Sequence, residues 1–328
     1  MSELRLDPLS QEWVAIAARR LARPVTSAGQ SCPFCPVPPS APAGEREASE
    51  APLGDYGVAV FANRFPSYGG PEGGALPAPA PGYRAAPGGG RAEIVLYSPR
   101  HDVHLATIPE AGVQLLVEVW RDRTVELYRD PAVQYVFPFE NRGRDVGQTI
   151  DHPHGQIYGY PLVPPRIARE LRHAAEHRRE EGECLQCEIL RREAAGAARL
   201  VDREPGWLAF VPYAPRFPFE VHLVPARHRG SLAELTPAET AELARLLQRT
   251  VGRYDRLHGD RMQYMMCVLG APRRTSPADL WHLRIAFYPI HRAKGRLKYL
   301  AGSESGAGAF LQDAAPESMA QALREAAR

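Results

Sequence analysis

The chain has 328 residues, of which 44% are hydrophobic and 24% charged, and its 40 basic side chains nearly balance 38 acidic ones. At roughly 100–200 residues per domain, this length predicts two domains or one large one. The balanced charge gives nucleic acid no bulk electrostatic attraction, so nucleic acid is not expected as a partner. The sequence has no apolar stretch near the ~20 residues of a membrane span, and its first residues lack a secretory signal. We therefore expect a cytoplasmic protein with no membrane partner, whose five cysteines form no disulfide framework.

The sequence contains the same six elements twice, in the same order. The first copy runs through CPFC (32–35), VFANRFP (60–66), EIVLYSPRH (93–101), a helical stretch from Pro109, VQYVF (133–137) and DHPHGQ (151–156). The second runs through CLQC (184–187), LAFVPYAPRFP (208–218), EVHLVPARH (220–228), a helical stretch from Pro237, MQYMM (262–266) and WHLR (281–284). This register predicts a diverged duplication, with one half at residues 1–165 and the other at 166–328.

The strands and loops can be predicted in chain order. The Gly/Pro/Ala-rich residues 67–91 predict a surface loop. The β-branched runs at 93–97 and 220–224 predict strands. The apolar runs at 133–139 and 262–268 predict strands that are buried on at least one face.

Each copy also predicts a long amphipathic helix. The second helix has a clear start, with Thr236 as N-cap, Pro237 at the first helical position and Glu239 at the third. Residues 164–193 are charged and helix-prone, and we expect them to link the halves. Each half is therefore predicted to be an α+β unit, a mainly antiparallel sheet with packed helices.

Each copy carries two cysteines and two histidines at matching places. The two sets are Cys32, Cys35, His101 and His152, and Cys184, Cys187, His228 and His282. Two thiolates and two imidazoles suit tetrahedral Zn²⁺, and four protein ligands would make each site structural rather than catalytic. We predict two zinc ions per chain; the alternative in either half is a reduced CxxC pair without a metal.

The HPHGQ segment predicts the chemistry. In a strand, His152 and His154 face the same way, with Gln156 next on that side. A neutral imidazole can attack phosphorus, provided that its other ring nitrogen gives its proton to a fixed acceptor such as a backbone carbonyl. The second copy keeps His282 but has Arg284 where the first has His154, so His154 is the predicted nucleophile.

With these motifs, the sequence resembles the galactose-1-phosphate uridylyltransferase family, the transferase branch of the histidine triad superfamily. The resemblance covers almost the whole chain, including CPFC, VFANRFP, SPRH, the FENRG stretch at 139–143, HPHGQ and KYLAGSE at 298–304. It implies two tandem histidine-triad-like units, the N-terminal one catalytic and the C-terminal one degenerate. It also implies a homodimer that exchanges UMP between UDP-glucose and galactose 1-phosphate, by a ping-pong mechanism through a uridylyl-histidine.

The resemblance assigns further site residues by position. Gln156 matches the residue that binds the nucleotidyl phosphate; hydrolases of the superfamily have a histidine there, and a neutral amide cannot relay a proton to water. The matched substrate-binding positions are Arg20 and Arg23 in a loop that reaches the partner's site, Phe61 and Asn63 near uridine, Asn141 and Thr149 at the phosphates, and Lys298 and Glu304 near the hexose. For several of these, ordinary surface, turn or core roles remain as alternatives.

The sequence departs from the family at a second metal site. Many members build that site from a glutamate and three histidines, whereas this chain has Glu170, Leu269, Arg284 and Ala286 at those positions. We therefore expect no such site, and expect Glu170, His173 and His177 to lie on a solvated helix face.

Three functions stay open at this stage. Uridylyl transfer is preferred, and an ADP-glucose phosphorylase or another hexose-1-phosphate nucleotidyltransferase is the first alternative. A non-catalytic, zinc-stapled nucleotide-binding protein is the alternative of another class. Arg64 and Ser303, which stand where some members have other residues, leave the preference for base and sugar open.

Overall fold

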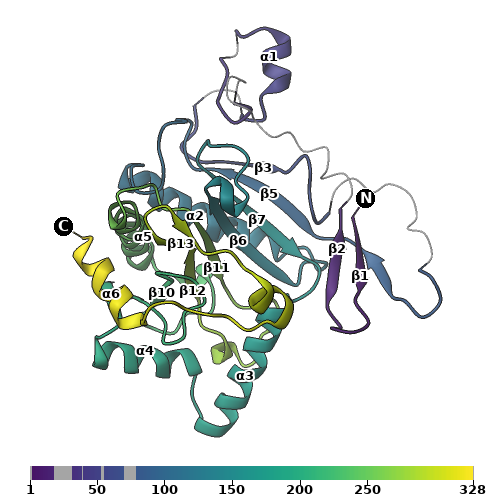
Figure 1. Ribbon diagram of the computed structural model, residues 1–328. Helices are drawn as coiled ribbons and strands as arrows, with labels where there is room; N and C mark the ends of the chain where they lie inside the picture. The colour runs from purple at the N-terminus through teal and green to yellow at the C-terminus, as the bar shows by residue number, and fades with distance from the viewer. Residues whose placement is uncertain (1, 18–31, 39, 53–54, 70–78, 328) are drawn as a thin grey trace.

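The structure is a computed structural model that describes residues 2–17, 32–38, 40–52, 55–69 and 79–327. Its centre is one antiparallel sheet of nine strands in the order β3-β5-β7-β6-β11-β12-β10-β9-β8 (Figure 1). From edge to edge these are β3 (Ala59–Ala62), β5 (Arg91–Leu96), β7 (His154–Tyr160), β6 (Tyr135–Arg142), β11 (Tyr264–Leu269), β12 (Arg284–Pro289), β10 (Val221–Pro225), β9 (Trp207–Phe210) and β8 (Leu200–Glu204). The predicted α+β class is confirmed.

The strand order displays the duplication. Read from either end, leaving out β8, the sheet has the same sequence of elements, because β3, β5, β7 and β6 repeat as β9, β10, β12 and β11. The halves meet where β6 pairs with β11, with Asn141 opposite Met265 and Phe139 opposite Cys267. The two predicted half-sheets therefore form a single continuous sheet, which the sequence did not indicate.

Two long helices cover one face of this sheet. Helices α2 (Glu110–Leu127) and α5 (Pro237–Leu257) pack against each other and against the strands in one core, which includes Trp120, Leu243 and Ile157. Thr236 and Glu239 form the predicted capping box at the start of α5. The capping box satisfies backbone N–H groups that the helix itself cannot pair, which fixes where the helix begins.

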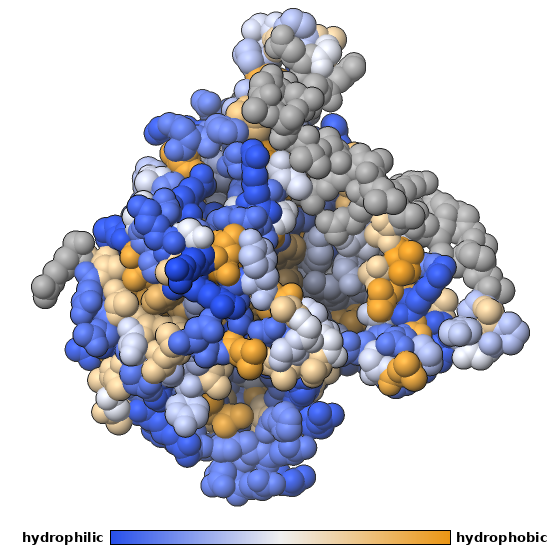
Figure 2. Space-filling model, in the orientation of Figure 1, coloured by the Kyte–Doolittle hydropathy of each residue, from blue (hydrophilic) through white to orange (hydrophobic). Residues whose placement is uncertain are grey.

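The opposite face is more open. A smaller apolar cluster lies there, in which Ile167 of α3 (Pro165–Glu181) joins Tyr135, Ala286 and Tyr288 of the sheet. Helix α4 (Leu185–Gly196) follows α3, so two helices form the predicted link between the halves. Figure 2 shows mainly hydrophilic side chains over the region of α3, as its charged sequence predicts.

The remaining elements lie around the sheet. They are β1 (Glu3–Leu6), β2 (Trp13–Ile16), β4 (Ala85–Pro87), α1 (Ala43–Ala48), the hairpin of β13 (His291–Ala293) and β14 (Arg296–Leu297), and α6 (Pro316–Glu325). Strand β4 pairs with β1 in a separate three-stranded sheet, so part of the predicted loop at 67–91 is strand instead. Among the helices that the described residues form, none is both long and apolar enough to cross a membrane.

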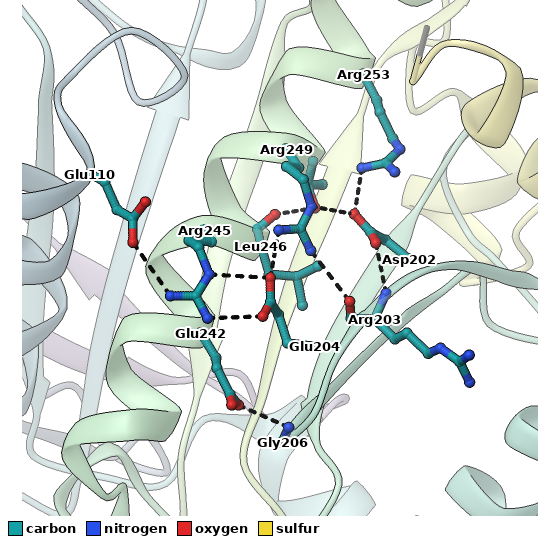
Figure 3. A network of polar contacts seen from close by, with 11 residues as sticks. Glu110, Asp202, Arg203, Glu204, Gly206, Glu242, Arg245, Leu246, Arg249 and Arg253 are labelled. Atoms are coloured by element: carbon teal, nitrogen blue, oxygen red, sulfur yellow. Dashed lines mark hydrogen bonds and ion pairs between the residues drawn. The ribbon is translucent and has the colours of Figure 1, made fainter.

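An ion-pair network fastens the edge strand β8 to helix α5 (Figure 3). Asp202 accepts from Arg249 at 2.8 Å and from Arg253 at 2.6 Å, and Glu204 accepts from Arg245 at 2.9 Å. Arg245 also reaches Glu110 of α2 at 3.4 Å. Because several charges share partners, the network joins three elements, which an isolated surface pair would not do.

Candidate active site and metal centres

The HPHGQ segment runs into the start of strand β7, which lies between β5 and β6. His154 is the first residue of the strand, opposite Leu96, and Gln156 lies between Ile94 and Phe139. Ile157 belongs to the core under the helices. Because successive side chains of a strand point to opposite faces, His154 and Gln156 lie on the open face.

The His154 ring is held in one orientation. Its Nδ1 lies 2.8 Å from the carbonyl oxygen of His152. A carbonyl only accepts, so Nδ1 carries a proton, and in the neutral ring Nε2 keeps the lone pair. The ring of Phe34 meets the His154 ring edge-on, with 5.0 Å between centroids. The His152 carbonyl is thus the fixed acceptor that a nucleophilic imidazole requires.

Gln156 is oriented by a residue that follows the edge strand β3, two places from β7 in the sheet. Asn63, just after β3, has its Nδ2 3.4 Å from Gln156 Oε1, and its own Oδ1 accepts the Phe65 N–H at 2.8 Å. Asn63 is thus a turn residue that also contacts Gln156, and its role near uridine stays a prediction. With Oε1 engaged, the Gln156 amide presents its N–H donors elsewhere. Phe61 is half-buried on β3, with its ring 6.0 Å from that of Phe34.

Gly155 allows the strand to pack closely on its other face. A β-carbon there would lie 2.3 Å from the Tyr97 hydroxyl and 2.8 Å from the Phe139 carbonyl oxygen. Tyr97 is fully buried, which raises the pKa of its phenol well above the ordinary value. The glycine of the motif is therefore required by the core beneath the site.

Hydrogen bonds of Gln148 hold the loop between Asn141 and Thr149 in one conformation. Gln148 accepts the Gly143 N–H at 2.6 Å and donates to the Ile150 carbonyl at 3.0 Å. Gly143 has φ of +110°, and a β-carbon there would lie 2.3 Å from the side chain of Gln263. These contacts fix the loop whose two ends carry the predicted phosphate-binding residues.

The first set of cysteines and histidines comes together. The ligand atoms of Cys32, Cys35, His101 and His152 all lie within 4.8 Å of one another. Cys35 Sγ lies 3.5 Å from His101 Nδ1 and 3.6 Å from His152 Nδ1. Sulfur and nitrogen ligands bound tetrahedrally to zinc stand about 3.6 Å apart, as the bond lengths of ~2.3 and ~2.05 Å require. The spacing therefore fits a tetrahedral ion.

The second set repeats this geometry. Cys187 Sγ lies 3.5 Å from both His228 Nδ1 and His282 Nδ1, in a group completed by Cys184. Burial, together with the neighbouring Cys184, raises the pKa of Cys187 to about 12, and burial beside Cys32 raises that of Cys35 to about 11. Both thiols thus need a nearby cation to ionise at neutral pH.

One histidine in each set is oriented by an equivalent backbone carbonyl. His152 Nε2 lies 2.8 Å from the Ser98 oxygen, and His282 Nε2 lies 3.0 Å from the Pro225 oxygen. Ser98 and Pro225 each stand three residues before the other histidine ligand. A ring N–H that donates to a carbonyl leaves Nδ1 free to bind metal, a common arrangement for metal-binding histidines. The structure therefore contains two Cys/His groups able to bind metal.

Four predicted substrate residues remain. Arg20 and Arg23 fall outside the described residues. Lys298 and Glu304 form a buried ion pair of 3.1 Å, and Lys298 also donates to the Leu311 carbonyl at 2.5 Å. No contact that the described residues make joins this pair to His154, so its role near the hexose stays a prediction.

The prediction of a solvated face is wrong for Glu170. Its carboxylate pairs with Arg166 at 2.9 Å and with Arg284, and its side chain is 28% exposed. Burial opposes ionisation, but the charges of Arg284 and Arg166 lower the pKa of Glu170 to about 2. Arg284 thus takes up a structural contact. The prediction is also wrong for His177, whose side chain is 17% exposed and pairs with Glu188 at 3.0 Å, whereas His173 is exposed as predicted. No metal group within the described part of the chain includes either histidine.

Sequence reasoning missed Phe34 and Gln148. Phe34 lies inside the CPFC motif, and its position between two metal ligands, which fixes it beside the site, could have indicated its role. Gln148 gives no such signal, because its hydrogen bonds close a loop whose shape the sequence does not show.

The architecture and the site define a duplicated α+β protein with an oriented histidine, His154, in one half and two Cys₂His₂ groups. The chain matches the N-terminal domain model of galactose-1-phosphate uridyl transferase over residues 1–164 and the C-terminal domain model over 170–327. The chain therefore belongs to the galactose-1-phosphate uridylyltransferase family.

Individual relatives agree. A galactose-1-phosphate uridylyltransferase of Thermotoga maritima is 35% identical over 333 residues, covering 99% of this chain and 98% of the relative. A solved structure described as a uridylyltransferase is 33% identical, with a TM-score of 0.88 over 99% of this chain and 98% of its own. An ADP-glucose phosphorylase of Arabidopsis thaliana is 24% identical over 98% of this chain and 92% of its own, and represents a related branch.

Proposed function

We propose that this protein transfers a uridylyl group from UDP-glucose to galactose 1-phosphate through a covalent intermediate on His154. The observation that carries the proposal is the 2.8 Å contact between His154 Nδ1 and the His152 carbonyl. In the neutral ring this contact leaves Nε2 unprotonated, and an unprotonated nitrogen is what an in-line attack on phosphorus requires. Family membership supports the identity of the group transferred.

The two half-reactions balance without a proton relay. Nε2 attacks the α-phosphorus of UDP-glucose, so a P–N bond forms and the bond to the oxygen of glucose 1-phosphate breaks. A phosphate oxygen of galactose 1-phosphate then attacks the same phosphorus, the P–N bond breaks and UDP-galactose forms. Both leaving groups are stable without added protons, so the Gln156 amide can donate hydrogen bonds to the phosphate without acting as an acid.

Mass spectrometry of the intact protein tests this directly. Mixed with UDP-glucose in the absence of an acceptor, the chain should gain the mass of one uridylyl group. His154→Gln should abolish this adduct and the transfer reaction, while metal content and fold persist. His173→Gln, at an exposed histidine on α3, is the matched control and should keep the adduct. A His154→Gln protein with full activity would exclude His154 as the nucleophile.

A second candidate is a phosphorylase or adenylyltransferase that uses ADP-glucose. It is favoured by the full-length likeness to the Arabidopsis relative of that name. The same experiment with ADP-glucose separates the two donors. An adenylyl adduct in place of the uridylyl adduct would assign the chain to this branch.

The metal-binding groups complete the proposal. Zn²⁺ held by Cys32, Cys35, His101 and His152, and by Cys184, Cys187, His228 and His282, would stabilise the two halves and take no part in the reaction, because all four positions are protein ligands. Metal analysis should give two zinc ions per chain. Clearly less than one would contradict both sites.

The remaining assignments rest on the family resemblance. Residues 1–165 form the catalytic half and 166–328 the degenerate half. The protein acts in the cytoplasm as a homodimer, in which Arg20 and Arg23 approach the partner's site, and Phe61, Asn141, Thr149, Lys298 and Glu304 contact substrate. Sedimentation equilibrium checks the dimer, and a mass of one chain would contradict it.

A further inference from the structure

A cavity of about 760 Å³ lies in the C-terminal half, on the open face of the sheet. Its floor includes Arg284 of β12 and His222 of β10. Ile285 and Leu223, their neighbours along the strands, belong to the core under the helices, so Arg284 and His222 must point to the other face. Helices α3 and α4 provide part of its walls, and residues from the segments 210–220 and 280–282 provide more of them. This volume lies within the range of pockets that bind small ligands.

The duplication relates this cavity to the catalytic site. Arg284 follows the metal-group histidine His282 by two residues, as His154 follows His152, and β12 repeats β7 in the sheet. Cys184 and His282 of the second metal group also line the cavity. The cavity therefore occupies, in the second half, the place that the reactive histidine occupies in the first.

The charge of the lining is positive. Five arginines and three glutamates line the cavity, and burial lowers the pKa of His222, which favours its neutral form. Arg199 pairs with Glu193, Arg192 pairs with Glu188, which lies outside the lining, and Glu170 lies between Arg166 and Arg284. Among the described arginines of the lining, one remains without a carboxylate partner.

That group is Arg216. Among the described residues, no carboxylate forms an ion pair with its guanidinium, which instead lies over the Phe310 ring at 4.8 Å from the centroid. Glu220 accepts the backbone N–H of Arg216 at 2.7 Å and contacts His222 at 2.9 Å, so its carboxylate is engaged elsewhere. Burial and the charges of Arg166 and Arg169 lower the pKa of Arg216. A phosphate there would relieve the repulsion among these guanidinium groups, and an arginine can bind it with two hydrogen bonds.

The apolar walls of the cavity favour a nucleobase over a free sugar. They include Leu185, Ile189, Phe210, Pro212 and Trp281, which are apolar or aromatic. Among the described lining residues, Gln186 supplies the single amide and Tyr213 the single hydroxyl. A free sugar needs several hydrogen-bond partners for its hydroxyls, whereas a nucleobase can be bound largely by apolar and stacking contacts.

We propose that this cavity binds a nucleoside monophosphate, with its phosphate at Arg216 beside Arg166 and its base against the apolar wall. The site would be a second nucleotide-binding site, separate from His154, and without chemistry of its own because Arg284 replaces the nucleophile. The proposal does not depend on which group the catalytic half transfers.

Calorimetric titration of the intact, metal-loaded chain with UMP tests the proposal. The wild-type protein should bind two UMP per chain, one at each half. Arg216→Gln should weaken one site at least tenfold, leaving the other site and the rate of uridylyl transfer within twofold of wild type. Arg179→Gln, an exposed arginine of α3 that pairs with Glu180, is the matched control and should keep both sites.

Three results would overturn the proposal. They are a single UMP per chain in the wild type whose affinity Arg216→Gln leaves unchanged, two unchanged sites in Arg216→Gln, or inorganic phosphate that displaces UMP from the second site at equal concentration, which would leave only a simple anion site. Thermal unfolding checks that Arg216→Gln folds. If it does not, Arg216→Lys keeps the charge without the two-pronged geometry, and undiminished binding by that variant would equally contradict the contact.

Discussion

Replacing Gly155 by alanine should displace strand β7, because the new side chain would clash on the face of the sheet opposite His154. The new β-carbon would start 2.3 Å from the Tyr97 hydroxyl and 2.8 Å from the Phe139 carbonyl oxygen, where ordinary contacts begin at 3.4 Å. The strand and Tyr97 would therefore have to separate by roughly 1 Å, and neither a buried ring nor a strand backbone yields easily.

The expected cost follows from this overlap. Overpacking of a core typically costs about 1–3 kcal/mol, and we expect Gly155→Ala to lower the free energy of unfolding by that amount. Because displacements of about 1 Å can reduce catalysis on the order of a hundredfold, kcat for transfer should fall at least tenfold as His154 moves. Urea unfolding and the steady-state rate measure the two effects.

Two variants show whether the overlap is the cause. Adding Tyr97→Phe to the Gly155→Ala protein removes the hydroxyl from the clash but leaves the Phe139 oxygen. The free energy of unfolding should therefore recover only in part. Gly196→Ala is the matched control, because a β-carbon there meets nothing within 4 Å; it should leave stability unchanged or slightly raised. A Gly155→Ala protein within about 0.5 kcal/mol of wild type and fully active would refute the argument, since unexceptional surface substitutions have effects of that size.

Three further predictions follow from the site and its surroundings. Gln156→His should raise hydrolysis of UDP-glucose relative to transfer, because an imidazole can relay a proton to and from water; release of glucose 1-phosphate without acceptor measures it. Cys187→Ala should remove one metal ion per chain and lower the midpoint of thermal unfolding, whereas retention of two ions would contradict the ligand assignment. Glu170 has a folded-state pKa lowered to about 2, so its pairing with Arg284 and Arg166 stabilises the fold above the unfolded pKa of about 4 and is lost as pH falls toward 2. Glu170→Gln should therefore flatten the loss of stability between pH 5 and 2 in acid titrations, and an unchanged slope would oppose this.

The sequence predicted the elements that repeat and the motifs that they carry. Thr236, Pro237 and Glu239 indicated the start of α5 because capping is local. The two metal groups could be predicted because their members recur at matching positions in both halves. The contrast with Arg284 in the second copy led to the prediction of His154 as the nucleophile, which the mass measurement above tests.

What the sequence did not indicate depends on contacts between distant residues. The pairing of β6 with β11 joins the halves into one sheet, and nothing local to either strand specifies its partner. Glu170 was misassigned because the helix around it is rich in charge, while its partner Arg284 lies more than a hundred positions away in the sequence. The support of Gly155 by Tyr97 is likewise visible only in three dimensions.

The central position of β6 has a consequence for synthesis of the chain. Strand β7 can pair with β6 as soon as residue 160 is available, but the other side of β6 must wait until β11 has been made, after residues 143–263. Throughout that interval the nascent N-terminal half exposes an unpaired strand with Phe137 and Phe139 on it. Such an edge invites association with other chains, so rapid elongation or chaperone protection should matter most for this protein between the emergence of its two halves.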